Sequence, residues 1–258
     1  MIRLRSLLVL CLGLALAPGL RAQGSVTVAA AADLQFALAD VKAAFQQAHP
    51  GVQVTATFGS SGAFFAQIAN GAPFDVFLSA DEDYPQKLVR AGLGQPGDLF
   101  RYSRGHLVLW VPKGSPLAIE QLGLKALLEP AARKVAIANP RHAPYGRAAE
   151  AALAKLGLLD AVRPRLVFGE NISQTAQFVQ SGAADIGILA LSLAKGPALA
   201  AAGRYVEVPP DAYPAMNQGG LLLSRAKGNP AARAFCDFLR SPGAVAILKR
   251  YGFAVDGR

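Results

Sequence analysis

The sequence predicts an α/β protein of two lobes, each a mostly parallel sheet flanked by helices. Short β-rich runs alternate with amphipathic helical patterns, which is typical of parallel sheets covered on both faces. The alternation occurs in two series, with breaks near residues 102–106 and at the proline-rich segment 208–216. These breaks predict lobe 1 from residues 23–104 and 214–258 and lobe 2 from residues 105–213. If the C-terminal helices return to lobe 1, two strands form the hinge.

The first series contains three strands, each followed by a helix. Leu34, Leu38, Val41 and Phe45 recur at helical spacing and predict one buried face of the first helix. Asn70-Gly71 is a typical end for the second helix. The predicted strands are 25–30, 52–58 and 75–78, and the predicted helices are 34–47, 63–69 and 79–91.

In the second series the helical patterns also end at small residues that stop helices. Gly157 and Ser181-Gly182 end two helical patterns, and buried β-rich runs precede them. A final strand and two helical stretches complete the chain. The predicted strands are 106–111, 135–138, 166–168, 186–189 and 220–224, and the predicted helices are 145–156, 173–180, 230–239 and 243–251.

Residues 1–22 have the pattern of a signal peptide. Two arginines precede an apolar run at 7–17, Pro18-Gly19 breaks it, and 20–22 is a suitable cleavage site. We therefore expect export to the periplasm. Cleavage leaves Cys236 as the single cysteine, so no internal disulfide can form, and its apolar helical surroundings predict a packing thiol.

The charge of the chain is modestly basic. Removing the three arginines of residues 1–22 lowers the formal net charge from +9 to about +6. No basic run contains interleaved aromatic residues, so we expect no nucleic-acid partner. The three histidines lack the spacing of metal ligands, and we expect no cofactor and no directly bound metal.

Four turns of small and polar residues each lie where a predicted helix begins after a strand. A helix N-terminus presents unpaired N–H groups and the positive end of a dipole, so it favours anions. Several such ends facing one cleft would hold a small oxyanion without lysine or arginine. These turns, at 31–34, 59–62, 143–146 and 170–173, therefore predict a receptor for a tetrahedral anion.

The order of several short segments resembles the periplasmic molybdate-binding proteins of ABC importers, within the type II periplasmic binding proteins. The resemblance implies two lobes that close on molybdate or tungstate and deliver it to a permease in the inner membrane. It also implies that the protein does no chemistry on the ligand, and we expect a monomer. The segments are 29–34, 58–62, 71–81, 138–146, 169–172 and 249–253.

The resemblance assigns ligand contacts to individual residues. Ser61 matches a serine that donates its hydroxyl and amide, and Ile172 matches a residue that donates its backbone N–H. Tyr145 matches a position that is a tyrosine in some members. Many members have a tyrosine where this chain has Ala190, so we expect the Tyr145 hydroxyl to replace it.

Asp33 departs from the pattern, because many members have serine there. A carboxylate beside a dianion is repulsive, so we expect it to cap its own helix while its N–H faces the ligand. Ala32 and Ser60 are secondary candidates for ligand contact.

Three other functions remain open at this stage. One is a receptor for another small oxyanion or a carboxylate, which the departures at Asp33 and Ala190 favour. The second is an exported serine hydrolase using Ser61 with His142 and a carboxylate, although Ser61 is not in a Gly-x-Ser-x-Gly elbow. The third is a structural module without a ligand. In the receptor interpretation the basic residues near the turns, Arg141, His142 and Arg147, face solvent.

Overall fold

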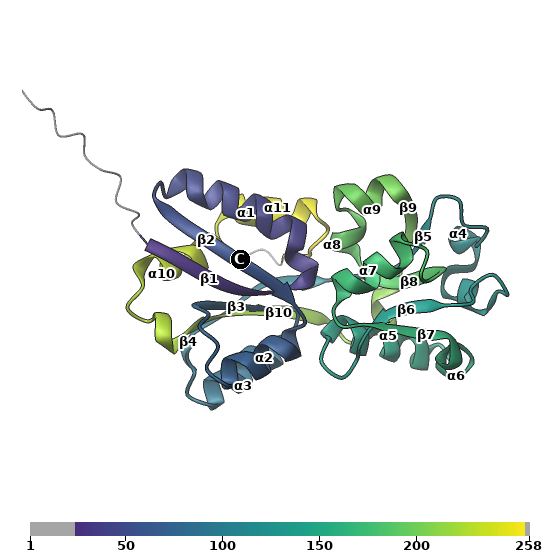
Figure 1. Ribbon diagram of the computed structural model, residues 1–258, viewed down its shortest axis with the longest axis horizontal. Helices are drawn as coiled ribbons and strands as arrows, with labels where there is room; N and C mark the ends of the chain where they lie inside the picture. The colour runs from purple at the N-terminus through teal and green to yellow at the C-terminus, as the bar shows by residue number, and fades with distance from the viewer. Residues whose placement is uncertain (1–23, 256–258) are drawn as a thin grey trace, which may run out of the picture.

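The computed structural model describes residues 24–255 and contains two five-stranded sheets, each with its own helices (Figure 1). The strand orders are β2-β1-β3-β10-β4 and β7-β6-β8-β5-β9. We call the first sheet with its helices lobe 1 and the second sheet with its helices lobe 2. The predicted signal peptide, residues 1–22, lies outside the described residues, and the exact lobe boundaries stay a prediction.

Lobe 1 is built from the two ends of the described chain. Its C-terminal helices α10 and α11 pack against β1 and α1, so the chain returns to this lobe. Its strands are β1 Gly24–Ala31, β2 Val52–Gly59, β3 Val76–Ser79, β4 Gly94–Gly105 and β10 Met216–Leu223. Its helices are α1 Gln35–Ala48, α2 Ser61–Ala69, α3 Asp83–Arg90, α10 Pro230–Phe238 and α11 Pro242–Arg250, with 3-10 turns η1 Ala32–Leu34 and η5 Ser224–Ala226.

Lobe 2 is formed by the continuous middle of the chain. Its strands are β5 Leu107–Pro112, β6 Val135–Ala138, β7 Leu166–Gly169, β8 Ile186–Ala190 and β9 Gly203–Glu207. Its helices are α4 Ile119–Leu122, α5 Pro144–Lys155, α6 Leu159–Val162, α7 Ile172–Gln180, α8 Leu191–Ala194 and α9 Pro197–Ala202, with 3-10 turns η2 Gly123–Leu128, η3 Arg163–Arg165 and η4 Pro210–Ala212.

The sheets are mixed, whereas the sequence predicts mostly parallel sheets. β1 pairs in parallel with β2 and β3, and β6 pairs in parallel with β7 and β8. β10 and β5 each run antiparallel to both of their neighbours. These two strands directly follow the passages of the chain from one lobe to the other, so they enter their sheets from the opposite end.

The sequence prediction misses two strands, β4 and β9. Both lie at the edge of their sheets. Edge strands bury one face weakly and so lack a clear alternation of apolar and polar residues. β4 also contains Pro96 and three glycines, and its first half is largely exposed.

Apolar cores pack against both sheets, and in lobe 1 two separate clusters cover the two faces of the sheet. In lobe 1, Phe45 of α1 makes edge-on contacts with Phe235 and Phe238. Cys236 is buried beside them, and burial raises the pKa of its thiol to about 12, which confirms the packing role. In lobe 2 the core includes the fully buried Trp110. No helix within residues 24–255 is both long and apolar enough to cross a membrane.

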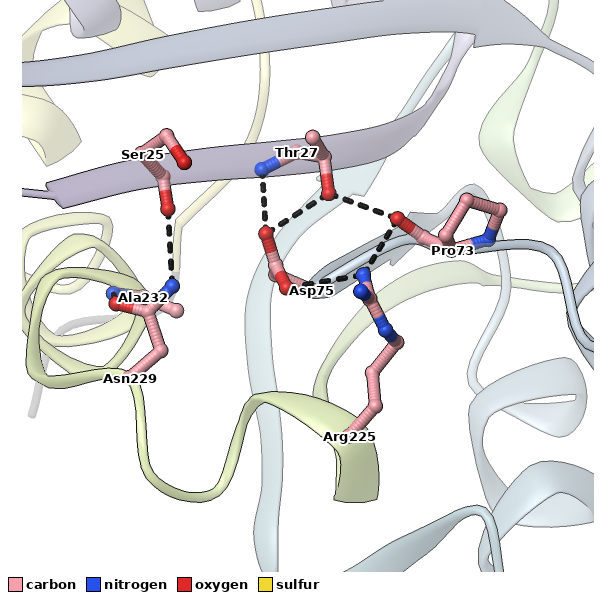
Figure 2. A network of polar contacts seen from close by, with 7 residues as sticks. All are labelled: Ser25, Thr27, Pro73, Asp75, Arg225, Asn229 and Ala232. Carbon is pink, nitrogen blue, oxygen red and sulfur yellow. Dashed lines mark hydrogen bonds and ion pairs between the residues drawn. The ribbon is translucent and has the colours of Figure 1, made fainter.

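A buried carboxylate links three elements on the side of lobe 1 shown in Figure 2. Asp75 Oδ2 accepts hydrogen bonds from the Thr27 N–H and the Thr27 hydroxyl, both at 2.8 Å. Arg225 donates to Asp75 Oδ1 at 3.2 Å and to the Pro73 carbonyl at 2.6 Å. The network joins β1, the segment before β3 and the turn after β10.

We expect Asp75→Ala to lower the free energy of unfolding by about 2–4 kcal/mol, because it leaves the Thr27 donors without their charged acceptor. Urea unfolding measures this. The matched control is Asp40→Ala, which removes a half-exposed carboxylate from the same lobe and should cost about 1 kcal/mol or less. Equal losses for the two variants would contradict the structural role of Asp75.

Candidate functional site

A small cavity lies between the lobes, where the carboxyl ends of β1, β2 and β3 face the starts of α5 and α7. Its empty volume is about 190 Å³. The structure brings all the candidate residues to its walls: Ala32, Asp33, Ser60, Ser61, Tyr145 and Ile172. Their contact with a ligand stays a prediction. The other lining residues are Ala31, Gly59, Ala80, Ala143 and Pro144.

Three helix starts converge on this cavity. Ser60 is the N-cap of α2, Asn171 is the N-cap of α7, and α5 begins at Pro144. The Asn171 side chain accepts a hydrogen bond from the Gln174 N–H at 3.0 Å, which fixes the first turn of α7. N–H groups in a first helical turn lack an acceptor within the helix. Those of Ser61, Tyr145 and Ile172 are therefore available donors at the cavity.

The Ser61 side chain is fully buried and held by one contact. Its hydroxyl oxygen accepts a hydrogen bond from the Ala80 N–H at 2.9 Å. A hydroxyl that accepts one bond still has a proton to donate. This arrangement orients Ser61 as a donor toward the cavity that it lines.

Asp33 does not cap its helix, which corrects the sequence expectation. The helical turn begins at Ala32, so Asp33 lies inside the first turn, and no side-chain cap is made. Its Oδ2 atom instead accepts hydrogen bonds from the Tyr145 hydroxyl at 2.9 Å and the Gln218 amide at 2.6 Å. Its Oδ1 atom is buried and has no hydrogen-bond partner.

Burial raises the pKa of Asp33 from 3.8 to about 6, although hydrogen bonds from Gln218 and Tyr145, and weaker ones from the backbone N–H groups of Asp33 and Leu34, favour the ionised form and hold the pKa down. The unfolded chain therefore releases this proton at a lower pH than the folded chain. Between these two values the folded state loses stability as the pH rises.

The hydrogen-bond partner of the Tyr145 hydroxyl also differs from the one that the sequence predicts. Tyr145 is 2% exposed, and its single hydroxyl proton is donated to Asp33. It cannot also replace the ligand-facing hydroxyl that Ala190 lacks. Burial, with the neighbouring Asp33, raises the pKa of Tyr145 well above its usual value, so this proton stays in place at neutral pH.

The structure does not pair Ser61 with His142, as the hydrolase alternative requires. Ser60 makes that contact, with 2.9 Å between its hydroxyl oxygen and His142 Nδ1. Glu170 Oε2 lies 3.4 Å from His142 Nε2. The Ser60 hydroxyl also accepts the capping bond from the Ala63 N–H at 3.4 Å.

Contacts across the cleft hold the lobes in a closed arrangement. The Gly62 N–H donates to the His142 carbonyl at 2.8 Å. Arg147 of α5 bonds Asp81 at 2.5 Å and the Tyr84 hydroxyl at 3.3 Å. His142 and Arg147 thus contact the opposite lobe. The receptor interpretation of the sequence instead places both side chains in solvent.

Two serines of lobe 2 add hydroxyl contacts to this closure. Ser173 donates to the Ala32 carbonyl at 3.0 Å and Ser192 donates to the Asp33 carbonyl at 2.8 Å. Both bonds hold η1, which carries Asp33, against lobe 2.

Sequence reasoning misses Gln218 and Ser103. Both are buried, and the Ser103 hydroxyl donates to Gln218 Oε1 at 2.8 Å, which orients the amide toward Asp33. The sequence feature that could have identified Gln218 is its place as a polar residue inside the buried run Met216–Leu223. A glutamine buried among apolar neighbours needs partners, and its partners here are at the site.

Two lobes that close over a cavity lined by helix starts define a two-domain solute receptor with the type II binding-protein fold. A family model described as bacterial extracellular solute-binding protein matches residues 26–254, and the chain belongs to this family. Among the described residues no group of three or more histidine, cysteine or acidic side chains could hold a metal ion.

Three of the similar proteins are named as molybdate-binding proteins. The chain is 40% identical over 251 residues to the molybdate-binding protein ModA of Azotobacter vinelandii, covering 97% of this chain and 98% of that protein. It is 39% identical to ModA of Rhodobacter capsulatus, covering 96% and 94%. The solved structure of an A. vinelandii periplasmic molybdate-binding protein superposes with a TM-score of 0.83 at 35% identity, covering 90% of this chain and all of that one.

We expect Gly62→Ala to prevent full closure of the lobes. A Cβ atom at this position would lie 2.7 Å from the His142 carbonyl oxygen and 2.5 Å from the Tyr84 hydroxyl. Alanine is a better helix former than glycine by up to about 1 kcal/mol, so folding should not suffer. Small-angle scattering should give a larger radius of gyration for the variant. Gly97→Ala, where a Cβ meets nothing within 4 Å, is the control and should match the wild type.

Proposed function

We propose that this protein is a periplasmic receptor that captures molybdate or tungstate between its lobes and delivers it to an ABC importer. Full-length similarity to two molybdate-binding proteins is the observation that carries the choice of ligand. The cavity supports it, because its lining residues in the described chain include no lysine or arginine and its donors are hydroxyl and amide groups. We further propose that it acts as a monomer, does no chemistry on the anion and contacts an inner-membrane permease.

Neutral donors suit a receptor that must also release its ligand. Each hydrogen bond to a charged group contributes about 1.5–3 kcal/mol, so a few of them hold a dianion. They are divided between the lobes, with Ser61 on lobe 1 and Ile172 on lobe 2. When the lobes separate, the anion loses the donors of one lobe at once.

Selectivity follows from size and protonation. Sulfate has the same charge and shape as molybdate but shorter bonds, so it fits loosely between donors set for the larger ion. Phosphate carries a proton at neutral pH, and a site of donors offers that proton few acceptors.

The hydrolase alternative has one supporting observation, the chain of contacts from Ser60 through His142 to Glu170. The chain of contacts does not include Ser61, the serine that this alternative needs, because the Ser61 hydroxyl bonds the Ala80 N–H instead. Ser60 is also occupied as a helix cap. We therefore assign His142 to positioning Ser60 rather than to activating it.

Molybdate and tungstate should raise the melting temperature, and sulfate at the same concentration should not. A ligand that binds only the folded state adds about 2.7 kcal/mol at roughly a hundredfold excess over its dissociation constant. Differential scanning fluorimetry measures the shift. Equal shifts for all three anions would indicate a general salt effect and would overturn the selectivity, and a response to phosphate alone would favour another oxyanion.

Ser61→Ala should weaken molybdate binding roughly ten- to a hundredfold, because one hydroxyl donor to a charged ligand is lost. The Ala80 N–H also loses its acceptor, so the variant should unfold at a lower urea concentration. Calorimetric titration of the folded variant separates the two effects. Unchanged affinity would place Ser61 outside the binding contacts.

A further inference from the structure

Asp33 poses an electrostatic problem for the proposed ligand. It is the only acidic residue among those lining the cavity in the described chain, and it is 1% exposed. An ionised carboxylate and a dianion in so small a space repel each other strongly, because little water screens them. No lysine or arginine lines the cavity to offset that repulsion.

The hydrogen bonds of Asp33 show where a proton can be placed. Oδ2 accepts from both Tyr145 and Gln218, so its two lone pairs are in use. Oδ1 is equally buried and has no partner. A proton on Oδ1 would remove the charge without disturbing either bond. It would also turn the unpartnered oxygen of this cavity-lining residue into a hydrogen-bond donor.

We propose that Asp33 takes up one proton on Oδ1 when the dianion binds and donates that hydrogen bond to an oxygen of the anion. The inference rests on the proposed function. The proton comes from solvent, the carboxylate becomes a neutral carboxyl group, and no covalent bond to the anion forms. The protein thus binds the dianion and a proton together.

The pKa of Asp33 supports this coupling. Burial raises it to about 6, so at neutral pH the carboxyl group is mostly ionised before binding. A nearby dianion raises the pKa further, because a like charge disfavours ionisation. At a pH between the pKa of Asp33 in the free protein and its pKa in the anion-bound protein, binding therefore takes up a proton. In this range the affinity for the anion falls as the pH rises.

Asp81, whose pKa burial raises, and His142 are the neighbouring groups to be distinguished from Asp33 as the proton carrier. Tyr102 and Tyr145 have pKa values raised well above the usual one by burial, so both stay neutral. The contacts from α7 and α8 are the hydroxyls of Ser173 and Ser192. Asp81 and Arg147 pair with each other across the cleft, Glu170 is exposed beside His142, and Lys195 after α8 is exposed.

The test is calorimetric titration of the full-length mature protein with sodium molybdate, in two buffers of different ionisation enthalpy at about pH 7.5. The difference in heat should correspond to about one proton taken up per anion. Affinity should fall roughly tenfold per pH unit above neutrality and level off below about pH 6. Asp33→Asn should remove both effects, because its NH₂ group replaces the Oδ1 proton at every pH.

Two controls assign the proton to its carrier. Asp40→Asn removes a carboxylate of the same lobe outside the cavity and should keep the proton uptake. His142→Gln should keep it as well, whatever its effect on affinity. Uptake that persists in Asp33→Asn would overturn the proposal, and its disappearance in His142→Gln would assign the proton to His142.

Difference infrared spectroscopy of the wild type gives an answer even if Asp33→Asn does not fold. Molybdate should replace one carboxylate band with the carbonyl band of a buried protonated carboxyl group. Molybdate binding without that band and without proton uptake would refute the inference and leave the proposed function standing. Absence of molybdate and tungstate binding to the wild type would refute the proposed function itself.

Discussion

The hydrogen bonds of one carboxylate oxygen join the two lobes at the cavity. Asp33 Oδ2 bonds Tyr145 of lobe 2 and Gln218 of β10, while Ser103 of β4 orients Gln218. β4 and β10 are the strands next to the two passages between lobes. The network therefore connects the cavity to the hinge. Any change in the charge of Asp33 acts on the ligand, on the interlobe contact and on the hinge strands together.

The fold explains how an anion site forms without cationic side chains. Parallel pairing of β1 with β2 and β3 places three strand ends at one edge, and each is followed by a turn that starts a helix. Lobe 2 repeats this arrangement with β6 and β7, followed by α5 and α7. When the two edges face each other, first-turn N–H groups from both lobes point into one small space.

The sequence predicts local structure and the position of the site well, because both follow from periodicity and from turn residues next to helices. Every candidate residue lines the cavity. The sequence predicts poorly the role of a residue whose hydrogen-bond partners lie far away along the chain. The role of Asp33 is decided by Tyr145 and Gln218, which are 112 and 185 positions away. A short polar residue before a helical pattern resembles a cap until the start of the helix is known to within one residue. Gln218 carries no motif, and only its buried setting reveals its function.

The ion pair between Arg147 and Asp81 is more exposed than the interlobe contact between Asp33 and Tyr145 at the cavity. The Arg147 side chain is 42% exposed and the Asp81 side chain 17%, whereas Asp33 and Tyr145 are almost fully buried. Dissolved salt screens exposed charges over about 10 Å at 0.1 M but acts far less on buried groups. Rising ionic strength therefore loosens the mouth of the cleft before it affects the contacts at the cavity. In a compartment whose ionic strength changes with the external medium, the rate at which the lobes open would change with that medium. The selectivity for the anion would stay the same.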